Sequence, residues 1–334
     1  MADDQRTVAE LGEIALIERI ANRVGLPGPG DILTGDDAAV FTSPGESLVY
    51  TTDALVEMVD FEMTSATGFD VGWKALAVNV SDVAAMGARP RYATSALCLP
   101  PDTLVSVVDQ VADGLDACAR RWGVALAGGD ISGARDIVLS VALVGWINHG
   151  QEVRRSGAQI GDAIYVTGSL GGAAAGLAGC RSGLKDADDA WTRLSARQLR
   201  PEPRVEEGEH IRMAGASAMI DISDGLAVDL WHLLDASGVG CEIDTAAVPV
   251  DPDLQAVSLP EGTPDPLTLA ILGGEDFELL FTIDERLEDQ LVRSFEHLAT
   301  SATRIGTATD GVARLGDEPL DQWRKRGWEH LRTR

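Results

Sequence analysis

Six short acidic motifs, each set among Gly, Ser or Thr, are spread along the whole 334-residue chain. They are Gly35-Asp36-Asp37, Thr51-Thr52-Asp53, Ser81-Asp82, Gly129-Asp130, Asp221-Ile222-Ser223-Asp224 and Gly274-Glu275-Asp276. Carboxylates that a fold brings together need cations, and Mg²⁺ is commonly held by a few carboxylates together with the oxygens of a substrate phosphate. The motifs therefore predict a fold that gathers distant segments around a metal-assisted phosphate site.

The length and charge of the chain limit the kind of protein it can be. At 334 residues, 45% of them hydrophobic, two domains of roughly 150 residues with real cores are expected. A formal net charge of −26 argues against binding to nucleic acid or to an anionic membrane. Most acidic residues outside the motifs are expected to form a solvated surface, so an anionic ligand must be held by metal ions or local groups.

Several common site classes and targeting signals are missing from the sequence. Only three of the 27 basic residues are lysines, and the absence of a G-x-x-x-x-G-K-[ST] loop excludes a Walker-type nucleotidase. The five histidines show no metal-binding spacing, and the cysteines form no C-x-x-C pair, so they are expected to be reduced, packed thiols (Cys98, Cys118, Cys180 and Cys241). The chain has neither a signal-like start nor an apolar run of about 18 residues, so a soluble, cytoplasmic protein is expected.

Apolar periodicity predicts a mixed α/β (α+β) fold. Helices are expected at 7–24, 69–86, 103–121 and 225–237, and after the glycine turn at 167–172. Strands are expected at 38–42, 47–52, 92–98, 123–127, 137–147, 163–167, 239–243 and 277–283, and before Asp221. A polar, turn-rich stretch at 148–162 places the domain boundary near residue 150, which divides the chain into residues 1–150 and 151–334.

Some motifs are expected at the ends of these elements, where each also has an ordinary structural explanation. Thr51-Thr52-Asp53 is expected at the C-terminal end of its strand, and Gly128-Gly129-Asp130 in the turn between two strands. Asp37 could belong to a simple turn or helix cap. The glycine turn at 167–172 could bind an anion at the following helix, or be a plain strand-to-helix connection.

Other motifs are harder to explain as structure alone. Asp82 lies in an apolar helix, where an unpaired carboxylate is costly to bury. A helix cap accounts for one of Asp221 and Asp224 but not for both. The glycines before Glu275 indicate close approach by a ligand or another backbone segment. Lys74 could hold a phosphate, or could form a surface ion pair with the residue four positions before it.

Eight motifs, which include these acidic residues, occur in a fixed order along the chain. They are Gly35-Asp-Asp-Ala-Ala-Val40, Thr51-Thr-Asp53, Trp73-Lys-Ala-Leu-Ala-Val-Asn-Val-Ser-Asp-Val-Ala-Ala-Met-Gly-Ala88, Gly128-Gly-Asp130 with Arg155-Ser-Gly-Ala158, Thr167-Gly-Ser-Leu-Gly171, Asp221-Ile-Ser-Asp-Gly-Leu226 and Gly273-Gly-Glu-Asp-Phe-Glu-Leu-Leu-Phe281. Together they closely resemble the motifs of the thiamine-monophosphate kinase family, over nearly the whole chain.

This resemblance implies a two-domain aminoimidazole ribonucleotide synthetase-like fold. The N-terminal domain would bind ATP and Mg²⁺ and form a homodimer, and the C-terminal α/β domain would complete the active site. The implied reaction is the phosphorylation of thiamine monophosphate to thiamine diphosphate, with ATP as co-substrate and several Mg²⁺ ions.

The resemblance also implies roles for single residues. The implied metal ligands are Asp37, Thr51, Thr52, Asp53, Asp82, Asp130, Asp221 and Asp224. The implied ATP contacts are Asp37, Gly129, Asp130, Arg155 and Ser223, and the implied substrate contacts are Asp60, Glu275 and Trp328. Two positions depart from the family pattern: Asp60-Phe61 replaces the usual His-Phe, and Leu331 replaces the final aromatic residue of the C-terminal motif.

No catalytic side chain is expected, because the acceptor is a phosphate oxygen whose second pKa, about 6, leaves it ionised near pH 7. Direct in-line transfer assisted by several Mg²⁺ ions is therefore expected, without a phosphoenzyme.

The alternatives are another ATP-using member of the same fold and a cation-binding scaffold without catalysis. A hydrogenase-maturation relative would need a C-terminal cysteine, whereas this chain ends Leu-Arg-Thr-Arg. A selenophosphate synthetase would need a reactive Cys or selenocysteine near its N-terminus, whereas the first cysteine here is Cys98.

Overall fold

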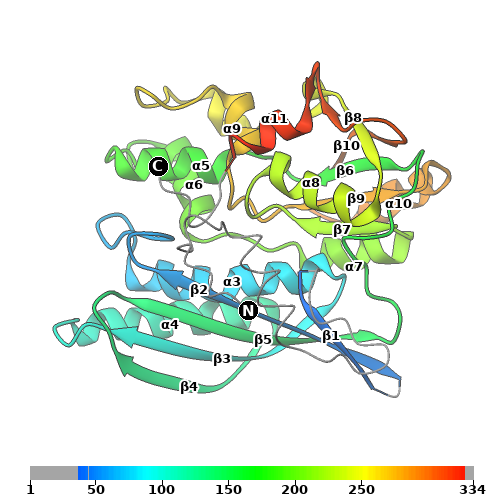
Figure 1. Cartoon of the computed structure of the whole chain (residues 1–334). Helices are drawn as coiled ribbons and strands as arrows, with labels where there is room; N and C mark the ends of the chain where they lie inside the picture. Colours follow the sequence, from blue (N-terminus) through cyan, green and yellow to red (C-terminus); the bar gives the residue numbers. More distant parts are fainter. Residues whose placement is uncertain (1–36, 44, 328–334) are drawn as a thin grey trace, which may run out of the picture.

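The computed structural model describes residues 37–43 and 45–327. The helix expected at 7–24 and the expected substrate contact Trp328 lie outside the described residues. Within them, two β-sheets lie one above the other, with helices between them (Figure 1). None of the described helices is long and apolar enough to cross a membrane.

The N-terminal sheet has five strands in the order β1-β2-β5-β3-β4, and only the β3–β4 pair is parallel. Its strands are β1 (Ala39–Ser43), β2 (Glu46–Val56), β3 (Arg89–Leu99), β4 (Ala125–Gly133) and β5 (Val138–Asn148). Odd-numbered residues of β5 are buried and even-numbered ones are half-buried, because successive side chains of a strand point to opposite faces. One face of the sheet therefore belongs to the core.

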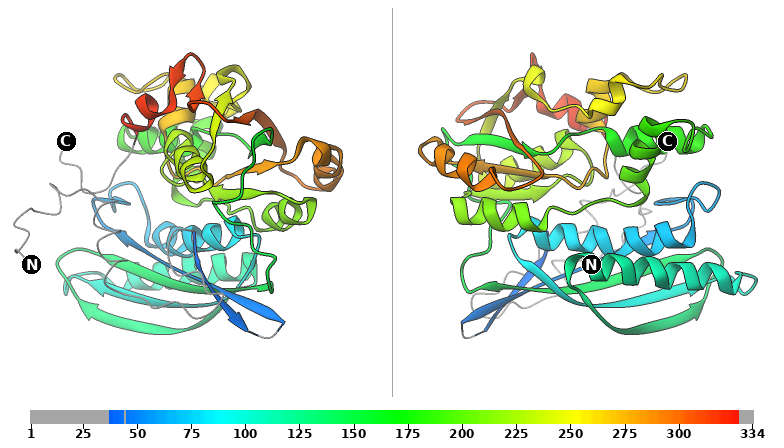
Figure 2. Two further views of the ribbon diagram at one scale, coloured as in Figure 1. Left: turned by 45° about the vertical axis from the view of Figure 1, so that its right-hand side comes forward. Right: turned by 180° about the vertical axis from the view of Figure 1, so that it is seen from behind.

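Helices α3 (Gly68–Ala85) and α4 (Val105–Trp122) cover that buried face (Figures 1 and 2). They pack closely, since a Cβ on Gly72 would lie 2.0 Å from the carbonyl oxygen of Val111. Helix α3 begins with a capping box between Thr67 and Asp70. It also contacts β7 (Ala218–Asp221) and α7 (Val205–Ala214) of the C-terminal part, so α3 joins the two halves of the molecule.

The C-terminal sheet has seven strands in the order β12-β11-β8-β10-β6-β9-β7. They are β6 (Ala163–Thr167), β7 (Ala218–Asp221), β8 (Gly240–Ile243), β9 (Leu279–Ile283), β10 (Ala302–Thr309), β11 (Arg314–Leu315) and β12 (Glu318–Pro319). The helices of this half are α5 (Gly172–Arg181), α6 (Asp189–Leu199), α7 (Val205–Ala214), α8 (Leu226–Ser237), α9 (Pro266–Leu272), α10 (Glu288–Phe295) and α11 (Leu320–Arg324). The mixed α/β fold class is confirmed.

Two local expectations were wrong. Thr51-Thr52-Asp53 lies in the middle of β2, because pairing with β5 continues to Val56. Gly128-Gly129-Asp130 lies inside β4 instead of in a turn, because β4 continues its parallel pairing with β3 as far as Gly133. A Cβ on Gly129 would lie 2.0 Å from the carbonyl oxygen of Ser95, so glycine serves the close approach of two strands.

Candidate functional site

Three carboxylates from separate parts of the chain form one cluster. One side-chain oxygen each from Asp37, Asp82 and Asp221 all lie within 4.8 Å of one another. Asp37 precedes β1, Asp82 lies on α3, and Asp221 ends β7, so both halves of the molecule contribute to the cluster. Such a group of carboxylate oxygens suits a hard cation such as Mg²⁺.

Hydroxyl groups hold two of these carboxylates in place. Thr51 on β2 donates from Oγ1 to Oδ2 of Asp82 at 2.5 Å. Ser81 donates from Oγ to Oδ2 of Asp221 at 2.6 Å. Asp53 shares the inner face of β2 with Thr51, and it lies close enough to Asp82 for its charge to raise the pKa of that carboxyl group. The structure thus gathers five of the predicted ligands: Asp37, Thr51, Asp53, Asp82 and Asp221.

The cluster is electrostatically unfavourable without a cation. Burial raises the pKa of Asp82 well above its ordinary value, and the charges of Asp53, Asp221 and Asp37 raise it further. Burial and Asp37 likewise raise the pKa of Asp221, and burial raises that of Asp53. A bound divalent cation would reverse this effect by favouring the ionised carboxylates. The donor set therefore fits Mg²⁺.

The positively charged side chain of Arg155 lies beside the carboxylate cluster. Its guanidinium contacts the buried carboxylate of Asp37 through two hydrogen bonds, Nε to Oδ2 at 3.1 Å and Nη2 to Oδ1 at 2.8 Å. Such a two-point pair fixes the orientation of both groups. The Arg155 side chain is partly exposed, at 26%. Arg155 therefore offers a positive charge where an anion could approach the carboxylates.

The turn that follows Asp221 is held by a carboxylate that the sequence analysis did not assign. Asp229, in the first turn of α8, accepts three backbone N–H bonds, from Ser223 at 3.1 Å, Asp224 at 3.1 Å and Gly225 at 3.0 Å. An acidic residue in the first turn after a Ser-Asp-Gly sequence is the signal that could have identified it. Asp229 thus fixes the turn that carries Ser223 and Asp224 beside Asp221.

The segment around Glu275 is strained and is tied to this turn. Glu275 and Phe277 have positive φ angles of 68° and 50° although neither is glycine. Their backbone N–H groups donate to the carbonyl oxygens of Ser223 at 2.8 Å and of Ile222 at 2.9 Å. A Cβ on Gly274 would lie 2.4 Å from the Ser223 carbonyl oxygen, so the close approach of a backbone segment predicted here is confirmed.

A carboxyl group of the same chain binds the backbone N–H groups of the glycine turn before α5. Asp276 accepts the backbone N–H bonds of Gly171 at 2.6 Å and Ala173 at 3.0 Å. Burial raises the pKa of Asp276 to about 7, although these two hydrogen bonds act against the rise. In the structure, the anion at this helix N-terminus is a side chain of the same chain.

Lys74 does not form the local ion pair considered from the sequence. Its Nζ lies 2.5 Å from Oε1 of Glu275 and donates to the carbonyl oxygen of Asp60 at 3.2 Å, and the side chain is only 3% exposed. Asp70 instead accepts from Thr67 in the α3 cap. The other oxygen of Glu275, Oε2, accepts from Nε2 of Gln198 at 2.5 Å.

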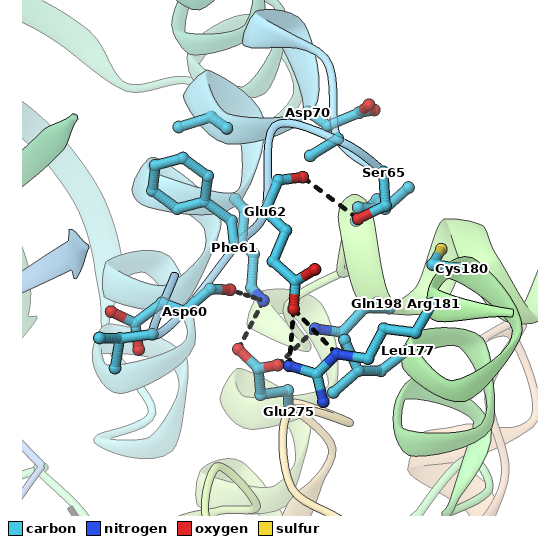
Figure 3. A pocket seen from close by; sticks show the side chains of 15 residues that line it. Asp60, Phe61, Glu62, Ser65, Asp70, Leu177, Cys180, Arg181, Gln198 and Glu275 are labelled. Carbon is cyan, nitrogen blue, oxygen red and sulfur yellow. Dashed lines mark hydrogen bonds and ion pairs between the residues drawn. The ribbon is translucent and has the colours of Figure 1, made fainter. Parts of the chain in front are cut away.

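These groups line a cavity of about 40 Å³ between the start of α3 and helices α5 and α6 (Figure 3). Its polar side includes Asp60, Glu275 and Gln198, and its apolar side includes Phe61 and Leu199. Asp60 and Glu275, both predicted substrate contacts, therefore lie in one cavity. Since backbone bonds tie Glu275 to the turn of Asp221, the cavity adjoins the carboxylate cluster.

Three other predicted residues lie apart from the cluster. Thr52 points to the opposite face of the sheet from Thr51 and donates to the carbonyl oxygen of Val141 at 3.0 Å. Gly129 and Asp130 lie on the edge strand β4, three strand positions from β2, which corresponds to about 14 Å. Asp130 is exposed and accepts from Ser132 at 3.3 Å.

Comparison with known families gives two adjoining matches. The model described as "AIR synthase related protein, N-terminal domain" matches residues 35–147. The model described as "AIR synthase related protein, C-terminal domain" matches residues 159–316.

Individual proteins agree with this result. The chain is 38% identical over 331 residues to thiamine-monophosphate kinase of Escherichia coli O157:H7, covering 96% of this chain and 99% of the relative. A solved structure named "AaThiL complexed with AMPPCP and TMP" superposes with a TM-score of 0.84 at 33% identity, covering 98% of this chain and all of the other. The hydrogenase maturation protein HypE of E. coli has a TM-score of 0.65 at 22% identity, covering 83% and 88% of the two chains, and shows only the shared fold.

Proposed function

The chain belongs to the thiamine-monophosphate kinases of the AIR synthase-related family, and we propose that it transfers the γ-phosphoryl group of ATP to thiamine monophosphate. The products would be thiamine diphosphate and ADP. The single observation that carries this proposal is the cluster of Asp37, Asp82 and Asp221, which both halves of the molecule build beside Arg155. The related structure named with AMPPCP and TMP supports both substrates.

We propose that several Mg²⁺ ions bind at this cluster. Asp37, Asp53, Asp82 and Asp221 would be the ligands, with Thr51 assisting, since the structure brings these groups together. Asp224, Thr52 and Asp130 remain proposed ligands from the family pattern. When bound, Mg²⁺ supplies positive charge for phosphate oxygens that a protein of net charge −26 would otherwise repel.

The chain's own residues would bind and orient the two anionic substrates. Arg155 would contact a phosphate of ATP, because its guanidinium is held beside the cluster and its side chain is partly exposed. Ser223 would contact ATP from the turn fixed by Asp229, and Gly129 and Asp130 would contact it from β4. Asp60 and Glu275 would contact the acceptor from the cavity, together with Trp328.

The proposed transfer is direct and in line, without a covalent intermediate. The acceptor phosphate is already ionised near pH 7, so it needs no general base. Of the four thiols, Cys118, Cys180 and Cys241 are buried, and burial raises the pKa of each. None of these three is therefore activated as a nucleophile.

We further propose a homodimer formed through the N-terminal domain, residues 1–150, with residues 151–334 completing each active site. In the described part of the chain, helices cover only one face of the five-stranded sheet (Figure 2). The other face carries Tyr50, Tyr92 and Trp146 among small side chains. A second copy would bury this face. The substrates of the proposed reaction indicate the cytoplasm as the compartment.

The decisive experiment measures thiamine diphosphate and ADP formed from Mg-ATP and thiamine monophosphate. Asp53→Asn and Asp221→Asn should lose most of the activity while remaining folded, whereas Asp109→Asn, on the exposed face of α4, should keep it. Equal amounts of the two products from the wild type would support the kinase. Absence of thiamine diphosphate from a folded wild type would refute it, and a labelled phosphoenzyme from γ-labelled ATP would refute direct transfer.

A further inference from the structure

Gln198 is a buried polar residue that no sequence motif identified. It lies near the end of α6 and is only 4% exposed, and its side chain lines the cavity that contains Asp60 and Glu275 (Figure 3). Its Nε2 donates to Oε2 of Glu275 at 2.5 Å. Gln198 is therefore attached to a proposed substrate contact without being one of the family motif residues.

The orientation of the Gln198 amide follows from its partner. A carboxylate accepts hydrogen bonds and cannot donate them, so the amide nitrogen must face Glu275 and the carbonyl oxygen must point elsewhere. Lys74 lies 2.5 Å from the other oxygen of Glu275 and forms an ion pair with that carboxylate. A flipped amide would bring two acceptor oxygens together. The amide atom of Gln198 that points away from Glu275 is therefore the carbonyl oxygen Oε1.

Oε1 of Gln198 is buried and has no hydrogen-bond partner among residues 37–43 and 45–327. A buried acceptor without a donor costs free energy, so such an atom is usually explained by a water molecule or a ligand. The adjoining cavity of about 40 Å³ has room for roughly three water-sized groups. It can therefore admit the polar edge of a ring, but not a complete ring, in the conformation described.

We propose that Gln198 is a specificity-determining residue for the acceptor substrate, whose ring amino group donates a hydrogen bond to Oε1. This inference rests on the proposed function, because the pyrimidine ring of thiamine monophosphate carries one amino group. Glu275 and Gln198 both line the cavity and are joined by a hydrogen bond. Phe61 and Leu199 form the apolar side of the same cavity. The site thus selects a ring that carries an amino group over a ring of the same shape that lacks this group.

The test compares thiamine monophosphate with an analogue in which hydrogen replaces the pyrimidine amino group. The wild type should have a KM for the analogue roughly 10- to 100-fold higher, a difference of about 1.4–2.7 kcal/mol, with kcat nearly unchanged. Gln198→Met has similar length but no carbonyl, and should treat both substrates alike. Its KM for ATP should stay within about twofold of the wild-type value. Gln159→Met, at an exposed glutamine, is the matched control and should discriminate as the wild type does.

The outcomes separate this inference from the proposed function. A wild type that phosphorylates thiamine monophosphate but accepts the analogue equally well overturns the role of Gln198, and the kinase proposal stands. The role of Gln198 is also overturned, and the kinase proposal stands, if Gln198→Met still discriminates fully between thiamine monophosphate and the analogue. A folded wild type that phosphorylates neither compound overturns the proposed function and this inference with it. The wild-type arm needs no variant, so it remains decisive even if Gln198→Met does not fold.

Discussion

Ser81 on α3 donates a hydrogen bond to Asp221 at the end of β7, across 2.6 Å in space and 140 residues in sequence. Both side chains are buried, and they belong to different halves of the molecule. The bond therefore fixes the orientation of a cluster carboxylate from outside its own sheet. Hydrogen bonds that involve a charged group are among the stronger ones in proteins.

Removing that hydroxyl should weaken both the fold and the metal site. Ser81→Ala is expected to lower the free energy of unfolding by about 1–3 kcal/mol, because Asp221 loses a buried donor. It should also raise the Mg²⁺ concentration needed for half-maximal activity, which titration of the kinase reaction would measure. Ser106→Ala, at an exposed position on α4, is the control. An unchanged Mg²⁺ requirement would contradict the positioning role of Ser81.

Asp82→Asn should have opposite effects on the protein with and without metal. In EDTA we expect the variant to be at least as stable as the wild type, because it removes one of several repelling carboxylates. Saturating Mg²⁺ should stabilise the wild type by about 2.7 kcal/mol at 100 times the dissociation constant, and stabilise the variant much less. Thermal unfolding with and without Mg²⁺ measures both effects. Equal responses of the two proteins to Mg²⁺ would show that Asp82 is not a ligand.

Asp276 should make stability fall as pH rises. Its pKa is about 7 in the folded protein, against 3.8 as the ordinary value. Between these pH values the folded state binds the proton more tightly, so the stabilisation is full below about pH 3.8 and is lost as pH rises to about 7. From pH 5 to pH 8, the stability difference between wild type and Asp276→Asn should shift by up to about 3 kcal/mol. Urea unfolding in EDTA at both pH values measures it, and parallel pH curves would contradict the assignment.

Gly274→Ala adds only one methyl group, but it should impair activity more than such a small change suggests. The added Cβ would lie 2.4 Å from the Ser223 carbonyl oxygen, so the Ser223 turn and Glu275 must separate. We expect a loss of about 1–3 kcal/mol in stability and a raised KM for the acceptor substrate. At Gly311 the nearest atom would lie 3.7 Å from a new Cβ, which makes Gly311→Ala the matched control. Wild-type kinetics in Gly274→Ala would show that the contact does not position Glu275.

The sequence was informative wherever local chemistry decides the structure. The helix expected at 69–86 corresponds to α3 at Gly68–Ala85, because its apolar spacing was clear. The burial cost of Asp82 in that helix pointed to a ligand or metal, and the structure places it beside Asp37 and Asp221. The mixed fold class and the family resemblance were likewise confirmed, by the two domain matches and by the similarity to thiamine-monophosphate kinases.

What the sequence could not reveal depends on partners that are distant along the chain. The i, i+4 spacing offered Asp70 as one possible partner for Lys74, but Lys74 is buried against Glu275, which lies 201 residues away. The face on which Thr52 lies follows from the register between β2 and β5. Asp229 was not assigned from the sequence, because its three N–H donors come together only when the preceding turn folds around it.

The strained backbone at Glu275 and Phe277 has a consequence for how the specificity of this enzyme can evolve. Left-handed φ angles at both residues, together with backbone bonds to the Ser223 turn, leave this segment little tolerance for β-branched substitutions or insertions. In the proposed acceptor site, drift toward a new acceptor would therefore proceed through side chains on the surrounding elements, such as Phe61, Leu177 and Leu199. The segment of Glu275 and Phe277 would change little during evolution, whereas the other residues that line the cavity would diversify.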